Sequence, residues 1–455
     1  MGRIASALLL LVVALMCCAV AMVKGYDHHE GGEGGERRER ERMFLLQDMK
    51  RVVRTDAGEM KMARGSHGWI SDMPNIHVGF VTMEPNSLFI PQYLDSDLIL
   101  FISRGEARVG SIYRDELIEK RLNCGDVYRI PAGSTFYLVN IADGQQLHVI
   151  CSIEKSDSIG WGTFQSFFIG GGSNPTSVLA GFEHSTLSTA LNVSESQVRQ
   201  ILTRQKSGPI ISLSNSHQSR VWSQFLEMKH YERVQCLKRM AQVHEETTEQ
   251  DEEPIMWKLL NSVIGNQVSG KDEGRSSKPD SYNLFEMTPD FENDYGSSVA
   301  VDQSAYLPLR QSGVGLYLVN LTAGSMMAPH LNPTATEYGI VLRGSGRIQI
   351  VFPNGTLAMN ARVNEGDVFW IPRYFPFCQI ASHSGPFEFF GFTTSARRNR
   401  PQFLVGSNSV LQSMRGPALA AAFGVSEERL ERIVNAQSES TILPSGPASA
   451  EKVKN

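Results

Sequence analysis

The amino-acid sequence predicts an all-β protein with helical extensions, built from two tandem copies of one unit. The main observation is a repeated motif: CGDVYRIPAG (124–133) and EGDVFWIPRY (365–374) share Gly-Asp-Val, an aromatic residue and Ile-Pro at the same spacing. Glycine permits the positive φ of a tight turn, and proline ends a strand because it has no N–H to donate. The chain has 455 residues, 41% of them hydrophobic, which is enough apolar material for two cores.

Each copy also contains a hairpin pattern upstream of this motif. Residues 90–110 and residues 328–350 each run through a proline, a polar bend, an apolar strand, an Arg-Gly pair and a second strand. Apolar runs bounded by turn residues are typical of β-hairpins. The same order of elements therefore recurs in both halves, with a repeat of roughly 235 residues.

Each copy ends in an amphipathic helix that begins after a serine. Ser194 with Gln197 fits a capping box, and the acidic residues after Ser426 suit the positive end of a helix dipole. An apolar stripe must be buried, so we expect the helices to pack against another subunit of a homo-oligomer, or else to fold back on their own barrel. The stripe residues at plus four, seven and eight are Val198, Ile201 and Leu202, and Leu430, Ile433 and Val434; Leu187 and Leu419 precede the serines by seven residues.

The first 21 residues have the pattern of a secretory signal peptide. Arg3 precedes an apolar run over 4–18, and Ala19-Val20-Ala21 supplies the small-x-small cleavage pattern. The run is short for a membrane span of roughly 20 residues, so we prefer a cleaved peptide to a signal anchor and expect no membrane segment in the mature form. The net charge of −5 argues against a nucleic-acid partner, which would require a basic face.

Entry into the secretory pathway would bring the cysteines into an oxidising compartment and expose Asn-x-Ser/Thr sequons to glycosylation. Cys124 and Cys151 are nearest in sequence and form the candidate disulfide, but sequence alone does not fix the pairing. Four scattered cysteines are too few to hold a protein of this size together. The cysteines of the mature chain are Cys124, Cys151, Cys236 and Cys378, and the sequons begin at Asn192, Asn320 and Asn354.

Charged stretches that are poor in apolar residues separate the units. We expect a flexible charged N-terminal segment at 22–43, an acidic and polar linker with a short helix at 236–281, and a flexible tail at 441–455. The two structured units are then 44–235 and 282–440, each ending in its helical arm.

Four parts of the chain together resemble the vicilins, which are seed storage globulins of the bicupin superfamily. These parts are residues 283–298, residues 318–333, the two Gly-Asp-Val turns and residues 389–411. The resemblance implies two tandem jelly-roll cupin barrels, each with a C-terminal helical arm, assembled as a homotrimer through those arms. It also implies transport through the secretory pathway to protein storage vacuoles, and a role as a nutrient reservoir that needs no catalytic group.

Metal-binding cupins carry a His-x-His-x4-Glu motif and a later Pro-x-Gly-x2-His motif, and both are incomplete here. The first falls on His330, Asn332 and Glu337, and the second ends on Phe377 instead of a histidine. Asn is a weak ligand and Phe is none. Cys378 follows Phe377 and is a candidate thiolate ligand, although successive strand residues point to opposite faces unless a bulge shifts the register.

Three functions are consistent with these observations. The first is a storage protein that requires no cofactor. The second is a metal-binding cupin with copper, zinc or manganese on His330, Glu337 and Cys378 and an oxidase or superoxide-scavenging activity. The third is a module that binds a small ligand at the mouth of a barrel. The incomplete ligand set favours storage. The first barrel, with Gln92, Leu94 and Phe136 at the corresponding positions, is expected to be structural.

Overall fold

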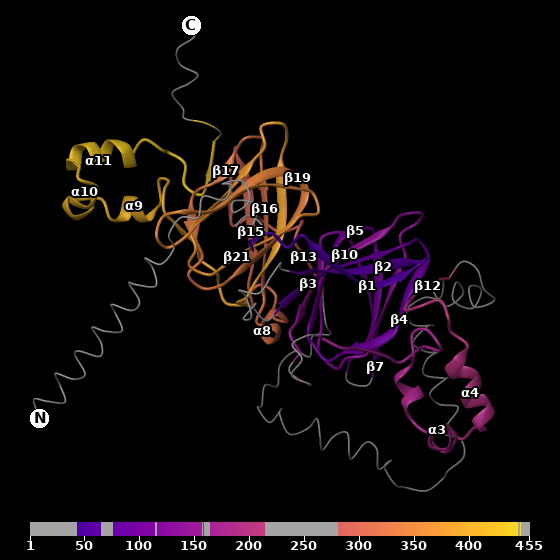
Figure 1. Cartoon of the computed structure of the whole chain (residues 1–455). Coiled ribbons are helices and arrows are strands. Elements are labelled where there is room, and N and C mark those ends of the chain that lie inside the picture. The colour runs from indigo at the N-terminus through magenta and orange to yellow at the C-terminus, as the bar shows by residue number, and fades with distance from the viewer. Residues whose placement is uncertain are drawn as a thin grey trace, which may run out of the picture.

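The computed structural model of the chain describes residues 43–64, 76–113, 116–156, 158, 164–213, 281–444 and 446. These residues form two β-barrels side by side, with a helical arm at each far end (Figure 1). The expected tandem β-barrels with helical extensions are therefore confirmed. Within the described ranges no helix is long and apolar enough to cross a membrane.

The first barrel consists of two antiparallel sheets. Its strands are β1 (Asp48–Thr55), β2 (Gly58–Arg64), β3 (Ile76–Met83), β4 (Ser87–Leu94), β5 (Leu98–Arg104), β6 (Ala107–Tyr113), β7 (Glu116–Leu122), β8 (Asp126–Ile130), β9 (Phe136–Asn140), β10 (Leu147–Glu154), β11 (Ser166–Phe168), β12 (Ile210–Ser212) and β13 (Tyr282–Asn283). One sheet has the order β1-β2-β3-β10-β5-β8-β13, and the other has β11-β4-β9-β6-β7, with β12 beside β4. The apolar faces of both sheets meet in a hydrophobic core.

The second barrel is organised around one long strand. Its elements are β14 (Phe291–Asn293), β15 (Gly296–Val301), α8 (Leu309–Ser312), β16 (Gly315–Leu321), β17 (Met326–Met327), β18 (His330–Leu331), β19 (Glu337–Val351), β20 (Leu357–Asn364), β21 (Val368–Ile371), β22 (Phe377–Ala381), β23 (Phe387–Thr393), β24 (Gln402–Phe403) and β25 (Ile442–Leu443). β19 pairs first with β21 and β23 and then with β20 and β22. Gly344 lies where β19 changes partners: its φ is 81°, and a Cβ there would collide with the carbonyl oxygen of Pro386.

The two repeated turns have the geometry that the sequence predicts. Gly125 and Gly366 have φ values of 91° and 87°, in the region that favours glycine. The carboxylates of Asp126 and Asp367 each accept a hydrogen bond from the backbone N–H three residues earlier, at 2.7 and 2.8 Å. The same local chemistry therefore starts β8 in the first barrel and β21 in the second.

Each barrel is completed by a segment from the other half of the sequence. β13, at the start of the second unit, pairs with β8 of the first barrel. In return, Leu45 forms a β-bridge with Phe369 in β21, and the N–H of Trp370 donates to the carbonyl of Phe44 at 2.9 Å. Phe44 is buried against the ring of Trp370. The exchange ties the two barrels together by backbone hydrogen bonds as well as by packing.

The joint between the barrels has an aromatic centre. Phe101 of β5 stacks on Phe390 of β23, with ring centroids 4.0 Å apart, and both side chains are fully buried. Phe285 meets the edge of Phe101. Residues of both barrels belong to one continuous hydrophobic core here. The barrels therefore share a core at the joint.

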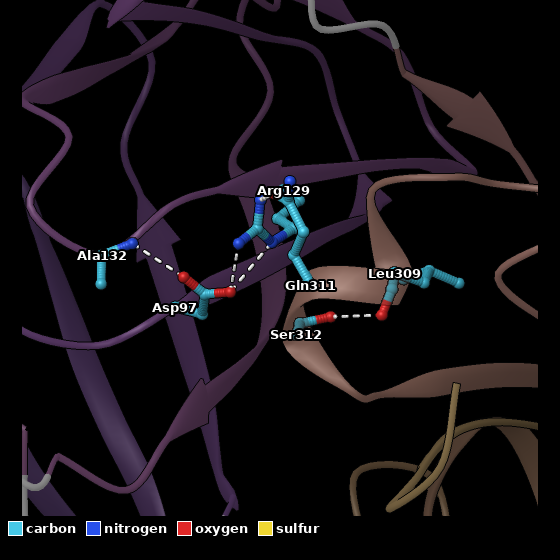
Figure 2. A network of polar contacts seen from close by, with 6 residues as sticks. All are labelled: Asp97, Arg129, Ala132, Leu309, Gln311 and Ser312. Atoms are coloured by element: carbon cyan, nitrogen blue, oxygen red, sulfur yellow. Dashed lines mark hydrogen bonds and ion pairs between the residues drawn. The ribbon is translucent and has the colours of Figure 1, made fainter. Parts of the chain in front are cut away.

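A polar network also links the two barrels (Figure 2). Arg129 of β8 forms an ion pair with Asp97, and its Nε lies 2.9 Å from the carboxylate. Arg129 also donates through Nη1 to Oε1 of Gln311 in α8, at 2.6 Å, which links the first barrel to the second. Asp97 accepts a further bond from the N–H of Ala132 at 2.8 Å. A buried ion pair is favourable only when additional hydrogen bonds satisfy its other donors and acceptors, and Gln311 and Ala132 supply two of these bonds.

The helical arms extend from opposite ends of the molecule (Figure 1). The first contains η1 (Val178–Gly181), α3 (His184–Leu191) and α4 (Glu195–Thr203), and the second contains α9 (Val410–Ser413), α10 (Pro417–Phe423) and α11 (Glu427–Val434). The predicted capping box of Ser194 and Gln197 is present, and Ser426 caps α11. The stripe residues at plus four and plus eight are buried in both arms, whereas Ile201 and Ile433 are 54% and 62% exposed.

Two expectations are corrected by the structure. Cys124, Cys151 and Cys378 are all free thiols, so the candidate disulfide between the first two is absent. The tail expected to begin at 441 contains an ordered strand, because the apolar pair Ile442–Leu443 adds to the sheet edge beside β17. Cys236, the signal peptide, the charged segment at 22–42 and the linker at 236–280 lie outside the described residues.

Candidate functional site

The second barrel contains an open cavity, and the first barrel is filled. The cavity of the second barrel has a volume of about 800 Å³, whereas the corresponding space in the first is about 30 Å³. Met60, Phe89 and Phe136 are among the side chains that line the small space, and they belong to the hydrophobic core of the first barrel. A volume of several hundred Å³ suits a small ligand. The candidate site is therefore in the second barrel.

His330 lies on β18 at the wall of this cavity and is almost fully buried. Its Nδ1 is 2.7 Å from the carbonyl oxygen of Ala328, which can only accept, so Nδ1 carries the proton. Burial lowers the pKa of His330 to about 4, and the ring is therefore neutral at physiological pH. The ring packs against Phe377 and Phe403, with centroids at 4.0 and 5.1 Å.

Glu337 begins β19 and also lines the cavity. Its side chain is buried and accepts a hydrogen bond from Nδ2 of Asn332 at 2.8 Å. Burial raises the pKa of Glu337 to about 7, against an ordinary value of 4.5. A carboxyl group with this pKa is mostly protonated in an acidic compartment and charged in an alkaline one.

Asn332 occupies the position of the second motif histidine in metal-binding cupins, and both ends of its amide form hydrogen bonds inside the protein. Its Oδ1 accepts from the N–H groups of Thr334 and Ala335, at 2.9 and 3.0 Å, and from the hydroxyl of Thr334. Its amide donates to Glu337. Asn332 therefore holds the turn into β19 and stabilises the buried carboxyl group.

Cys378 faces away from the other two candidate metal ligands. Phe377 is the β-partner of His330, so side-chain alternation places Cys378 on the opposite face of β22. Its Sγ is 3.6 Å from Oε1 of Gln349, on the neighbouring strand. Burial raises the pKa of the Cys378 thiol to about 11, which disfavours the thiolate that binds metals.

The structure thus brings together two of the three predicted ligands, His330 and Glu337, at one cavity. Among the residues that the structure describes, no group of three or more His, Cys, Asp or Glu side chains is close enough to hold a metal ion. One imidazole and one carboxyl group with a pKa of about 7 make an incomplete ligand set. A bound metal stays a prediction of the sequence.

Two cavity residues were missed by the sequence analysis. The hydroxyl of Tyr317 and Oε1 of Gln379 are buried at the cavity wall and have no hydrogen-bond partner in the described structure. Burial, with a smaller contribution from the charge of Glu337, raises the pKa of Tyr317 well above its usual value. Both lie on strands where alternate residues face inward, but alternation does not reveal which inward residues meet a cavity.

The mouth of the cavity is rich in arginine. Arg397, Arg398 and Arg400 line it and are exposed. Asp290 and Asp302 also line the mouth, and the charge of Arg398 contributes to lowering the pKa of Asp302 after its hydrogen bonds. The run ARRNR at 396–400 was the available sequence signal for this basic cluster.

Replacing Glu337 with glutamine should remove part of the pH dependence of stability. At pH values below about 4.5 the carboxyl group is protonated in the folded and unfolded states, and burial carries no charge penalty. Between pH 4.5 and about 7 the folded state binds more protons, so the free energy of unfolding falls as pH rises, by about 3 kcal/mol in all. Urea unfolding of E337Q should show a smaller decline over this range than the parent protein.

Glu431→Gln is a matched control for this prediction. Glu431 lies exposed on α11, so its replacement should leave the pH profile of urea midpoints unchanged. A profile for E337Q that parallels the parent protein would show that burial does not raise the pKa of Glu337 above its value in the unfolded chain.

Comparisons with known proteins agree with this architecture. Residues 73–199 and 282–431 match the cupin family model. A vicilin-like seed storage protein of Arabidopsis thaliana is 51% identical over 417 residues, which is 90% of this chain and 81% of the relative. A second vicilin-like seed storage protein of the same plant is 31% identical over 86% of this chain, and the chain spans about half the length of that relative.

Solved structures give the same result for the fold. The vicilin of hazelnut, Corylus avellana, superposes with a TM-score of 0.70 at 21% identity, covering 89% of this chain and 99% of that one. A vicilin of Solanum melongena has a TM-score of 0.72 at 21% identity, covering 90% of this chain and all of that one. That structure revealed different anionic ligands in structurally similar pockets.

Proposed function

The chain belongs to the vicilin-like seed storage proteins of the cupin family, and from this premise we propose that it is a non-catalytic nutrient reservoir, assembled as a homotrimer in protein storage vacuoles. The observation that carries the storage role is the 51% identity to a seed storage protein over 90% of the chain. A reserve needs dense packing and no reactive group, and the filled first barrel suits that requirement.

The proposed trimer is supported by a repeated apolar surface on the two arms. Three exposed apolar positions recur in both arms, at twelve residues before the capping serine, three before it and seven after it. Their exposed fractions run from 43% to 62%, although the arms bury their other apolar residues in small cores of their own. The pairs are Phe182 and Met414, Leu191 and Phe423, and Ile201 and Ile433.

A second copy of this chain is the partner that best fits this surface. The two arms lie at opposite ends of the molecule (Figure 1) and present matching apolar positions. If the first arm of one chain packs against the second arm of the next, every chain makes the same two contacts. Such a head-to-tail contact generates a closed ring when the rotation between subunits is right, and the resemblance to vicilins implies three subunits.

A second function, binding of a small anionic molecule, is favoured by the cavity of the second barrel. The unpartnered Tyr317 hydroxyl at its wall can donate a hydrogen bond to an anion, and the arginines at its mouth attract negative charge. The unpartnered Gln379 oxygen can accept a hydrogen bond from a hydroxyl or amine of the same ligand. The related Solanum melongena protein holds anions in its pockets. Native mass spectrometry of protein taken from seed would reveal such a ligand as added mass per chain.

Quantitative proteomics of seeds tests the storage role. Peptides of this chain should be abundant in the storage-vacuole fraction of dry seed and should fall steeply as seedlings grow, because a reserve is digested on germination. A constant low level in leaves and seedlings would contradict storage and would favour an enzymatic role.

A further inference from the structure

The three sequons of the chain lie in very different surroundings, and only one is free of both the barrel joint and the arms. We propose that the mature, assembled protein carries an N-linked glycan on Asn354 and none on Asn192 or Asn320. The inference rests on the proposed route through the secretory pathway, where the transferase acts. Three observations about the sequons support it.

Asn354 lies at the tip of the hairpin between β19 and β20 and is exposed. Two backbone hydrogen bonds of 2.9 Å close the tip: the N–H of Phe352 donates to the carbonyl of Thr356, and the N–H of Gly355 donates to the carbonyl of Phe352. Oδ1 of Asn354 accepts from the N–H and the hydroxyl of Thr356, at 3.0 and 2.7 Å, so the side chain bonds only within its own sequon. A Cβ added to Gly355 would meet nothing within 4 Å. The space around the tip is open to a bulky substituent.

Asn320 lies on the face of β16 that looks toward the first barrel. Asn320 pairs with Glu388 of β23. Phe390 lies two residues after Glu388 on the same strand. Phe390 points from the same face of β23 and stacks on Phe101 of the first barrel. Burial raises the pKa of Glu388, which marks this side of the sheet as partly closed to water. Asn320 itself is exposed, so a glycan on it would start at the rim of the joint between the barrels.

Asn192 lies inside the first arm, at the end of α3. It adopts a left-handed conformation with φ of 51°, and its N–H is bonded to the last turn of the helix. Its neighbour Leu191 is 43% exposed and belongs to the proposed contact between arms. The hydroxyl of Ser194, the third residue of the sequon, caps α4. A glycan at Asn192 would occupy the surface that another chain must cover.

The modification joins the side-chain amide to a sugar donor. Nδ2 of Asn354 bonds to the anomeric carbon of an oligosaccharide carried on a lipid pyrophosphate. The bond between that carbon and the pyrophosphate oxygen breaks, the lipid pyrophosphate leaves with the bonding electrons, and the amide nitrogen loses one proton to the transferase.

The full chain made in the secretory pathway of plant cells provides the test. Size exclusion separates trimer from monomer. Peptide mass spectrometry before and after glycosidase treatment then shows whether the asparagine of each sequon carries a glycan. We expect the trimer to carry a glycan on Asn354 alone, and any chain modified at Asn192 to be found with the monomers. N354Q and T356A should each lose the glycan, whereas T356S, which keeps a sequon hydroxyl, should retain it.

Two results would overturn the inference: an unmodified Asn354 in translocated chains, or a trimer that is heavily modified at Asn192 or Asn320. The amino-terminal peptide identifies translocated chains, because they lack residues 1–21. Chains that retain these residues and stay outside the secretory pathway would instead contradict the proposed route, so the two failures are distinguishable.

Discussion

Replacing Ile201 and Ile433 together with glutamate should convert the proposed trimer into single chains. Both side chains are more than half exposed in the isolated chain, so the substitutions should leave the fold intact. In the trimer the new carboxylates would be buried against apolar groups without a partner, and each burial costs several kcal/mol. Light scattering coupled to size exclusion should show the mass of one chain, with an unchanged circular dichroism spectrum.

Leu357→Glu is the matched control for this experiment. Leu357 is 49% exposed but belongs to β20 of the second barrel, far along the chain from either arm. The control should remain a trimer. A double arm variant that also stays trimeric would place the subunit contact elsewhere on the molecule.

Replacing Phe390 with alanine should destabilise the protein by about 3–5 kcal/mol, the range found for a buried aromatic side chain. Phe390 is fully buried at the joint and stacks on Phe101, so its removal leaves a cavity between two barrels that are also tied by exchanged strands. The surrounding backbone has little freedom to collapse into that space. Equilibrium unfolding in urea measures the loss.

A double-mutant cycle separates the stacking interaction from the cavity. The combined Phe101→Ala and Phe390→Ala variant should be less destabilised than the sum of the two single variants, because each single change already removes the same contact. An aromatic pair of this kind contributes about 0.5–1.5 kcal/mol beyond its buried area. Strict additivity would mean that the rings do not interact across the joint.

Local sequence patterns predicted the elements whose chemistry is local. The Gly-Asp turns and the serine caps were predictable because their donors and acceptors lie within three residues of each other. Because the sequence is duplicated, a turn or helix predicted in one half was also predicted at the matching position of the other half. Of the three stripe positions expected to be apolar and buried, those at plus four and plus eight are buried in both arms. The residue at plus seven is exposed in both arms.

The remaining features depend on contacts between distant residues. No local pattern shows that Leu45 would pair with Phe369 in the other barrel, because either barrel offers a free strand edge to the segment. The cavity was also unpredictable, since it depends on how the side chains of the whole barrel fill its interior. For Cys378, strand alternation raised the correct objection: the register between β19 and β22 is uninterrupted from Phe377 to Ala381, so Cys378 points to the face opposite Phe377.

The metal content of chelator-washed protein tests most directly whether the second barrel serves as packing or as a metal centre. Only His330 and Glu337 of the predicted ligands meet at the cavity, Asn332 is bonded to the turn and to Glu337, and Cys378 faces the other side of β22. These features predict a metal content well below one ion per chain, with no change in the His330→Ala variant. About one copper, zinc or manganese ion per chain that is lost in His330→Ala would contradict the storage account and establish the second barrel as a metal site.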